Sequence, residues 1–467
     1  MTEEQEKVLY FCNIPYQMCH FSVFDYEILS KCPIDQARGK HKEQINECFI
    51  MWDTETSKSK FDEWKTVKQG KREKREYLLN ENYVVAWTLA INIYGYNIVC
   101  LYGNKPSELV QVIGKIADTL PGTKTVFYCH NLGYDHQFCR RFFYRQFGYP
   151  VEQLNTKPHY PVNLHYKGGI HIRDSLILSQ RSIEKWADDL QVIHRKATGS
   201  WNYDRIRHQN GSFTKEELLY IQNDVLAGVE CLNAMRKTLH KTYSGMPYTQ
   251  TGIVRAEAKK KGQIHQAHKD AEKCYNDLSF YDLQEEIYHG GYTHANRHYT
   301  GFVNEGNIKC YDFASSYPYC ALTERMPVEA FNELEDTLTD EQILNSDLAF
   351  IFRFRACGIR LRNSSDPFPV LQVSKVRKVI NGIFDNGRIL QADFVDIYVN
   401  EIDYALIHKK YVWDQSWNTD IWFAEKDFLP EWLRDYIFEL FCNKTQLKGG
   451  DPVLYAIAKG MLNSVYG

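Results

Sequence analysis

The chain has 467 residues, of which 44% are apolar and 14% aromatic, enough apolar material for the cores of two or three domains. Its net charge of −3 excludes a small, uniformly basic nucleic-acid module. Any surface that binds a polyanion must therefore be local.

The amino-terminal residues and the cysteines indicate the compartment. Thirteen cysteines without framework spacing predict free thiols in a reducing environment. Residues 1–45 hold Cys12, Cys19, His20, Cys32 and His41, whose spacings match none of the usual zinc patterns, so we interpret them as structural, with zinc as the alternative. The chain begins with neither a basic nor an apolar leader, and no apolar run approaches the ~18 residues of a membrane span. We expect a cytoplasmic protein.

The first candidate site residues follow an apolar run at residues 48–52, which predicts a buried strand. Asp53 and Glu55 come directly after it. Because side chains alternate along a strand, both carboxylates lie on one face, where they can share a metal ion. An acidic strand end without function is the alternative.

A second carboxylate follows a second predicted strand. After a charged, mobile run at residues 58–75, two strands around a turn at residues 94–97 predict a small antiparallel sheet. A helix at residues 107–120, capped by Ser107, leads to a strand at residues 125–129. Asn131, Tyr134 and Asp135 come at the end of that strand.

A third carboxylate lies on a predicted helix. Thr214 and Glu217 form a capping box that opens this helix, and Tyr220 and Asp224 lie one turn apart on it.

The most basic stretch of the chain follows at residues 240–275, and it predicts either a solvated helix face or a track for phosphates. Tyr288, Gly290 and Gly291 then mark a turn where the backbone can approach a phosphate closely.

A second group of candidate site residues lies at residues 307–319. The apolar residues Ile308, Cys310 and Tyr311 predict a strand that ends in Asp312, where a carboxylate can bind Mg²⁺ together with substrate phosphates. Ser315 and Tyr317 follow, and they offer turn amides for a triphosphate and a ring that can lie under a sugar. A buried turn ended by Tyr-Pro is the alternative.

The end of the chain predicts a helix with a polar face. Asp451 and Pro452 have the pattern of an N-cap and first helical residue. Lys459, Asn463 and Tyr466 then fall on one face, at i, i+4 and i+7. This face carries a cation, an amide and an aromatic ring.

Together, the D-x-x-S-x-Y-P string at Asp312 and the K-x-x-x-N-S-x-Y-G string at Lys459 resemble motifs A and B of family B DNA polymerases, and most closely those of the protein-primed branch of viruses and linear plasmids. Ser316 departs from the leucine that is usual in motif A. The earlier D-x-E, N-x-x-Y-D and Y-x-x-x-D patterns resemble the three motifs of 3′–5′ exonucleases. A two-metal site with Mg²⁺ or Mn²⁺ would activate a water and stabilise the leaving 3′ oxygen there.

The resemblance implies a role for each candidate residue. It assigns catalysis to Asp53, Glu55, Asp135, Tyr220, Asp224 and Asp312, all of them metal ligands except Tyr220. It assigns nucleotide binding to Ser315, Tyr317, Lys444, Lys459, Asn463 and Tyr466. It assigns DNA binding to Asn131, Tyr134, Ser175, Leu176, Lys196, Tyr203, Tyr288, Gly290 and Gly291. For Ser175, Leu176 and Tyr203, ordinary packing in the protein is an equal alternative to DNA binding. For Lys444, the alternative to nucleotide binding is an exposed lysine that only contributes to solubility.

The resemblance also implies a fold class and a domain order. We expect α/β and α+β architecture, with an RNase H-like 3′–5′ exonuclease domain followed by an incomplete palm and fingers. The expected boundaries are an amino-terminal segment (1–45), the exonuclease (46–240), a basic linker (241–306), a palm (307–360), an insertion like the first terminal-protein region (361–425) and fingers (426–467). The second palm carboxylate of the family does not occur in the sequence, so we expect a truncated or split polymerase that cannot extend DNA alone.

The implied substrates are deoxynucleoside triphosphates, and the implied partners are a DNA primer-template, a terminal protein and a second chain or downstream segment with the missing carboxylate. The leading hypothesis is a protein-primed, proofreading DNA polymerase that replicates viral or plasmid DNA. The alternatives are a stand-alone 3′–5′ exonuclease with a remnant polymerase half, and a module that binds DNA or terminal protein.

Overall fold

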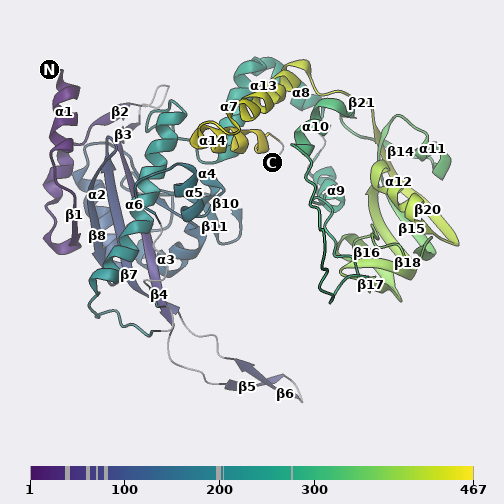
Figure 1. Cartoon of the computed structure of the whole chain (residues 1–467), viewed down its shortest axis with the longest axis horizontal. Coiled ribbons are helices and arrows are strands. Elements are labelled where there is room, and N and C mark those ends of the chain that lie inside the picture. Colours follow the sequence, from purple (N-terminus) through teal and green to yellow (C-terminus); the bar gives the residue numbers. More distant parts are fainter. Residues whose placement is uncertain are drawn as a thin grey trace. The chain divides into compact units, whose positions relative to one another are not determined.

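The structure is a computed structural model that describes residues 2–36, 43–58, 64–69, 72–77, 82–195, 201–202, 205–274 and 277–465. The chain divides into two compact units (Figure 1). Unit 1 comprises residues 1–254 and 443–465, and unit 2 comprises residues 255–442. Among the described residues, no helix is both long and apolar enough to cross a bilayer.

An eight-stranded mixed sheet forms the centre of unit 1, in the order β1-β8-β7-β4-β9-β12-β11-β10. The strands of this unit are β1 (Gln17–His20), β2 (Ile34–Gln36), β3 (Gln44–Asn46), β4 (Cys48–Lys58), β5 (Trp64–Gln69), β6 (Arg72–Tyr77), β7 (Asn82–Ile93), β8 (Tyr96–Gly103), β9 (Thr125–Cys129), β10 (Glu152–Lys157), β11 (Tyr160–Tyr166) and β12 (Ile170–Asp174). β4 is antiparallel to β7 and parallel to β9, so it lies in the interior of the sheet.

Helices cover both faces of this sheet (Figure 1). They are α1 (Glu3–Cys12), η1 (Phe21–Val23), η2 (Tyr26–Lys31), α2 (Pro106–Thr119), α3 (Leu132–Phe147), α4 (Ser175–Ser179), α5 (Ile183–Asp189), α6 (Lys215–Thr238) and α14 (Pro452–Asn463). One core joins α2 and α3 to inward-facing residues such as Ile50 and Trp52 of β4. The other joins α5 and α6 to Phe49 and Met51 of the same strand. Successive apolar side chains of β4 point to opposite faces of the sheet, so the strand contributes to both cores.

The local sequence patterns predicted several elements of unit 1. The strands at residues 48–52 and 125–129, the turn between β7 and β8, and the capping box of Thr214 and Glu217 are confirmed. Ser107 is not the cap predicted for α2, because the helix begins at Pro106, a residue whose fixed φ suits the first helical position. The charged run at residues 58–75 is not simply a loop, since β5 and β6 pair within it as a hairpin.

Unit 2 is built on an antiparallel sheet in the order β14-β20-β15-β18-β16, with β17 and β19 attached. Its elements are α8 (Ile264–Lys273), α9 (Leu278–Ile287), α10 (Ser316–Thr323), β13 (Met326–Pro327), β14 (Asn332–Leu334), α11 (Asp340–Leu344), β15 (Ala349–Leu361), η3 (Val373–Lys375), β16 (Val376–Ile380), β17 (Ile383–Asp385), β18 (Arg388–Asn400), α12 (Glu401–Lys410), β19 (Tyr411–Val412), β20 (Gln415–Ala424) and β21 (Lys426–Asp427). Two helices, α7 (Gln250–Lys261) and α13 (Glu431–Leu447), span the sequence boundaries between the units. Phe352 and Phe354 of β15 and Tyr404 of α12 are central to the core of this unit.

The strand predicted at residues 308–311 is wrong. The backbone from Ile308 to Phe313 is irregular, and the Tyr311 side chain is 86% exposed. A strand needs a neighbour for its backbone N–H and C=O groups, and none of the described strands pairs with this segment. Propensity alone therefore did not produce a strand here.

The sheet of unit 2 crosses one predicted domain boundary. Residue 361 ends β15, while β18 and β20, which pair with β15 along most of its length, lie within the predicted insertion. Asn381 and Gly382 lie between β16 and β17. The thirteen cysteines are free thiols. In the described part of the chain, no group of three metal-ligating side chains includes Cys12, Cys19, His20 or Cys32, and His41 lies outside that part.

Candidate active site

Strand β4 positions the first two carboxylates. Asp53 and Glu55 follow the apolar residues of the strand, on the same face as Met51. A register shift between Glu55 and Thr56 interrupts the pairing of β4 with β7 directly after the second carboxylate. Such bulges redirect side chains at functional edges of sheets. The predicted common face of Asp53 and Glu55 is therefore formed.

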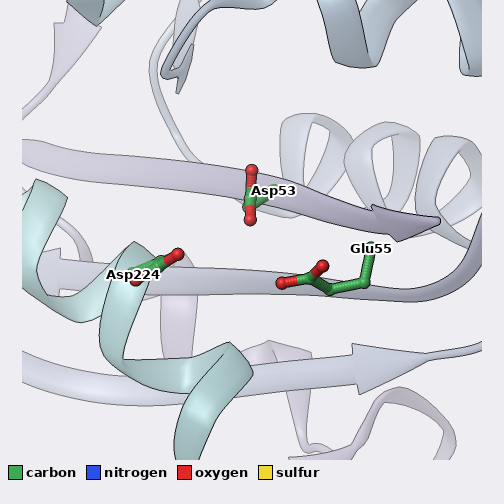
Figure 2. Close-up of side chains that lie close together, drawn as sticks. All are labelled: Asp53, Glu55 and Asp224. Atoms are coloured by element: carbon green, nitrogen blue, oxygen red, sulfur yellow. The ribbon is translucent and has the colours of Figure 1, made fainter. Parts of the chain in front are cut away.

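Helix α6 brings the third carboxylate to this face. Asp224 lies on α6, and each of Asp53, Glu55 and Asp224 offers an oxygen within 4.8 Å of those of the other two (Figure 2). The close approach of the helix depends on Gly228, one turn after Asp224. A Cβ built on Gly228 would lie 1.9 Å from the Met51 sulfur. The small residue therefore lets α6 pack against β4 at the carboxylates.

The three carboxylates open into a cavity of about 320 Å³, which we call the active-site cavity. Its lining residues are Met51, Asp53, Thr54, Glu55, Thr56, His130, Asn131, Tyr134, Asp135, Ile183 and Asp224. No lysine or arginine is among these described lining residues. Clustered carboxylate oxygens are the ligand set that hard divalent cations prefer. The donor set therefore fits Mg²⁺ or Mn²⁺.

Asp135 lines the same cavity from the opposite side of β4. It lies in the first turn of α3, not at the strand end where the sequence predicted it. The Thr54 hydroxyl, which points away from Asp53 and Glu55, donates a 2.5 Å hydrogen bond to the Asp135 carboxylate. Asp135 is not part of the three-carboxylate group. Burial raises the pKa of Asp135 to about 6, although the Thr54 hydrogen bond lowers it.

Asp174 is a residue that the sequence analysis missed. Its carboxylate, at the end of β12, accepts hydrogen bonds from the backbone N–H groups of Asn131, Leu132 and Leu176. It therefore holds the first turn of α3, which carries Tyr134 and Asp135, against the start of α4. Burial raises the pKa of Asp174 to about 6, although these N–H groups lower it. Its place directly before Ser175 in the sequence was the available signal.

The predicted DNA-binding residues near this cavity differ in exposure. Tyr134 is 47% exposed and Asn131 is exposed, with φ of +66° at the start of α3. Ser175 is fully buried, and its hydroxyl donates to the Cys129 carbonyl. Leu176 is half-buried, and neither it nor Ser175 is among the described residues that line the cavity. Lys196 and Tyr203 lie outside the described residues.

Tyr220 is less accessible than its predicted role requires. It is 4% exposed, and its ring stacks on Trp201 with the ring centres 5.9 Å apart. It is also absent from the described residues that line the active-site cavity. The helical spacing of Tyr220 and Asp224 is confirmed, and Asp224 but not Tyr220 is among the described residues that line this cavity.

The motif A residues belong to unit 2. Ser315 has φ of +56° and is the N-cap of α10, so the turn before this helix is left-handed. Asp312 is exposed, and Tyr317 is 55% exposed. A Cβ built on Gly291 would lie 3.0 Å from the Tyr317 hydroxyl, whereas a Cβ on Gly290 would meet nothing within 4 Å. The second glycine therefore leaves room for the Tyr317 side chain.

The neighbouring Tyr288 is the C-cap of α9 and is 71% exposed. The next residue, His289, pairs with Asp403 of α12, with 3.0 Å between the ring nitrogen and the carboxylate. This contact ties the two glycines to the main body of unit 2.

The motif B residues lie on the helix that the sequence predicted. Asp451 accepts hydrogen bonds from the N–H groups of Val453 and Leu454 and so caps α14. Lys459 and Asn463 are exposed on α14, four residues apart. Lys444 lies on α13 and is half-buried. Tyr466 lies outside the described residues.

The pKa values of Asp135 and Asp174 predict a dependence of stability on pH. Each is raised to about 6, above the ~3.9 of an unfolded aspartate, so the folded state binds more protons between these values. Without divalent cation, the contribution of these two groups to the free energy of unfolding is therefore expected to fall as pH rises from about 4 to about 6. Urea unfolding in chelator checks this.

The measurement compares the free energy of unfolding of Asp135→Asn with that of the unmodified protein at each pH. The variant is expected to gain stability relative to the unmodified chain as pH rises through this interval, since asparagine stays neutral. A difference that is constant with pH would contradict the raised pKa.

A mixed α/β unit with clustered carboxylates on a strand and a helix, joined to an α+β unit that carries the D-x-x-S-x-Y-P string, is the architecture of a DNA polymerase. The chain belongs to the family of type B DNA polymerases, organellar and viral, whose model matches residues 198–467. This confirms the family predicted from the two motifs. No curated protein sequence matches the chain.

Solved structures show the same fold. Phi29 DNA polymerase complexed with single-stranded DNA matches with a TM-score of 0.65 and 18% identity, over 90% of this chain and 67% of that chain. Phi29 DNA polymerase complexed with primer-template DNA matches with a TM-score of 0.60 and 16% identity, over 90% and 67%. The predicted α/β and α+β fold class, an exonuclease-type domain with palm and fingers, is thereby confirmed.

Proposed function

We propose that this DNA polymerase chain carries a 3′–5′ proofreading exonuclease in unit 1. The observation that supports this most directly is the group of Asp53, Glu55 and Asp224 at an open cavity. When bound there, divalent cations would activate a water for attack on the terminal phosphodiester and stabilise the leaving 3′ oxygen.

The side chains around the carboxylates suit a frayed 3′ end. Tyr134 is exposed at the cavity, and its hydroxyl lies 3.4 Å from the Thr56 hydroxyl. An exposed ring can stack on an unpaired base, whichever base it is. Asn131 offers an exposed side-chain amide beside it. Thr54 holds Asp135 by its hydrogen bond, and Asp135 must lose its proton to bind a cation.

The test of this function is the direction and metal dependence of digestion. With Mg²⁺ or Mn²⁺, the purified chain is expected to shorten 5′-labelled single-stranded DNA progressively and to release the label of a 3′-labelled strand at once. Chelator should stop both reactions. Digestion that begins at the 5′ end, or that persists in chelator, would refute the proposal.

The polymerase part of the proposal follows the motif assignments. We propose that Asp312 binds a catalytic cation, that Ser315, Lys444, Lys459, Asn463 and Tyr466 bind the triphosphate, and that Tyr288, Gly290 and Gly291 contact the DNA. A second chain or a downstream segment would supply the other palm carboxylate. We further propose priming by a terminal protein, in the replication of viral or plasmid DNA, which the insertion-like segment at residues 361–425 favours.

Tyr317 is expected to exclude ribonucleotides by contact with a 2′-hydroxyl. In a polymerase reconstituted with the second palm carboxylate, Tyr317→Val should raise the use of ribonucleotides relative to deoxyribonucleotides by about tenfold or more, the effect of relieving ~1.4 kcal/mol. Single-nucleotide extension rates measure this ratio.

The matched control is Tyr319→Val, because Tyr319 is equally exposed on the same helix but two residues away, on another face. Equal ratios in the two variants would show that the Tyr317 ring does not meet the sugar.

A further inference from the structure

Three cavities follow one another along helix α3. The active-site cavity shares Asn131 and Tyr134 with a second cavity of about 540 Å³, the middle cavity. The middle cavity shares Gln137 and Phe138 with a third of about 600 Å³, the outer cavity. All three belong to unit 1. The shared residues make them one path that leads from the carboxylates along the helix.

The charge of this path changes sign from one end to the other. The active-site cavity contains four carboxylates and no lysine or arginine among its described lining residues. The outer cavity contains Lys105 and Arg141 and no described carboxylate. Its full lining is Asn82, Tyr83, Val84, Lys105, Pro106, Ser107, Gln137, Phe138, Arg141, Phe142 and Gln209. A chain of phosphates is attracted to the basic end, whereas cleavage of its terminus needs cations at the acidic end.

Lys105 and Arg141 are available for a phosphate. Both are exposed, and within the described ranges neither forms an ion pair with a carboxylate. The Arg141 guanidinium lies 4.7 Å from the centre of the Phe142 ring, which holds it over the surface of α3. Arginine in such a position can form a forked hydrogen bond to a phosphate.

The middle cavity has the aromatic surfaces that unpaired bases require. The rings of Tyr134 and Phe138 lie one helical turn apart with their centres separated by 5.2 Å. Tyr160 is 47% exposed on the other side, with the Lys157 ammonium 4.1 Å from its ring centre. Rings of this kind bind bases of any sequence, and nearby cations hold the backbone.

The length of the path fits a short single strand. Ten residues separate Asn131 from Arg141 in the sequence, so their positions differ by ~15 Å along the axis of α3. A strand whose 3′ end lies at the carboxylates therefore reaches the outer cavity a few nucleotides upstream.

We propose that the outer cavity is a phosphate-binding subsite for single-stranded DNA, upstream of the cleaved 3′ end, with Lys105 and Arg141 as its ligands. The inference rests on the proposed exonuclease function and adds a second site to it. The subsite gives the enzyme a preference for strands long enough to span the path.

Binding in chelator tests the subsite without hydrolysis. Fluorescence anisotropy compares a dodecanucleotide with a competing trinucleotide, for the unmodified chain and for Lys105→Ala/Arg141→Ala. The double variant is expected to bind the dodecanucleotide about tenfold or more weakly and to show a shallower salt dependence, by ~0.7 per lost phosphate contact. Its affinity for the trinucleotide should stay the same. Lys105→Arg/Arg141→Lys should retain most of the dodecanucleotide affinity.

The matched control is Arg145→Ala/Lys185→Ala. Both residues are exposed in unit 1, and Arg145 lies on α3, but neither lines any of the three cavities. An equal loss in control and test variants, or an equal loss for both oligonucleotides, would overturn the subsite. If the unmodified chain binds as expected but digests nothing with Mg²⁺ or Mn²⁺, the exonuclease function fails while the subsite stands.

Discussion

Asp53→Ala/Glu55→Ala is expected to abolish digestion of single-stranded DNA, with a loss on the order of a thousandfold or more. The two side chains supply two of the three carboxylates that meet within 4.8 Å, and without them the remaining Asp224 cannot hold the cations. Metal and electrostatic terms contribute several kcal/mol to such reactions, and each ~1.4 kcal/mol is tenfold in rate. Initial rates on a 3′-labelled oligonucleotide measure the loss.

A thermal readout separates this loss from misfolding. Mn²⁺ should raise the melting temperature of the unmodified chain, because a ligand bound only by the folded state stabilises it. The double variant should lose this rise, yet melt no lower in chelator, since it removes two of three mutually repelling charges. The control is Glu184→Ala/Asp188→Ala, two exposed carboxylates on α5 that should change neither quantity. Undiminished digestion by the double variant would show that the assignment of the metal ligands is wrong.

Gly228→Val is expected to impair both the stability and the chemistry of unit 1. A side chain at Gly228 would overlap the sulfur of Met51, which is 1% exposed within the core between α6 and β4. Overpacking of this kind costs about 1–3 kcal/mol of stability. The displaced helix also carries Asp224 away from Asp53, and a displacement of ~1 Å can lower the rate about a hundredfold. Urea unfolding and nuclease rates measure the two effects.

Further variants show whether the contact between α6 and β4 causes these losses of stability and rate. Gly252→Ala places a Cβ on α7 at 3.1 Å from the Thr249 hydroxyl oxygen. A shift of a few tenths of an ångström relieves this contact while Thr249 keeps its hydrogen bond from the residue 252 N–H, so the change should leave stability and rate nearly unchanged. Met51→Ala vacates the space that a residue at position 228 needs. Gly228→Ala in combination with Met51→Ala should therefore cost less than the sum of the two single changes. Strict additivity would contradict the proposed packing.

The site was predictable from the sequence where it depends on neighbours in the chain. The alternation of side-chain direction along a strand places Asp53 and Glu55 on one face of β4. The capping residues Thr214 and Asp451 fix where α6 and α14 begin, because their side chains bond the free N–H groups of the first turn. These rules act over a few residues, and the structure agrees with them.

The tertiary structure decided what depends on distant residues. The packing of α6 on β4 through Gly228 brings Asp224 to the other two carboxylates. Tyr220, one turn before Asp224 on the same helix, stacks on Trp201 and is not among the described residues that line the cavity. Asp135 meets Thr54 on the opposite face of the strand, a pairing that no local pattern indicates.

By itself, the sequence determined the family, through two motifs whose residue types and spacing suffice. It also determined several elements of unit 1, among them β4, β9 and α6, and the common face of Asp53 and Glu55. Only the tertiary structure decided which carboxylates meet, that Asp174 holds two helix starts together, and that residues 308–311 form no strand. The physical reason is that side-chain periodicity and capping act within one element. Strand pairing and helix approach require partners from elsewhere in the chain, and their geometry is set by packing.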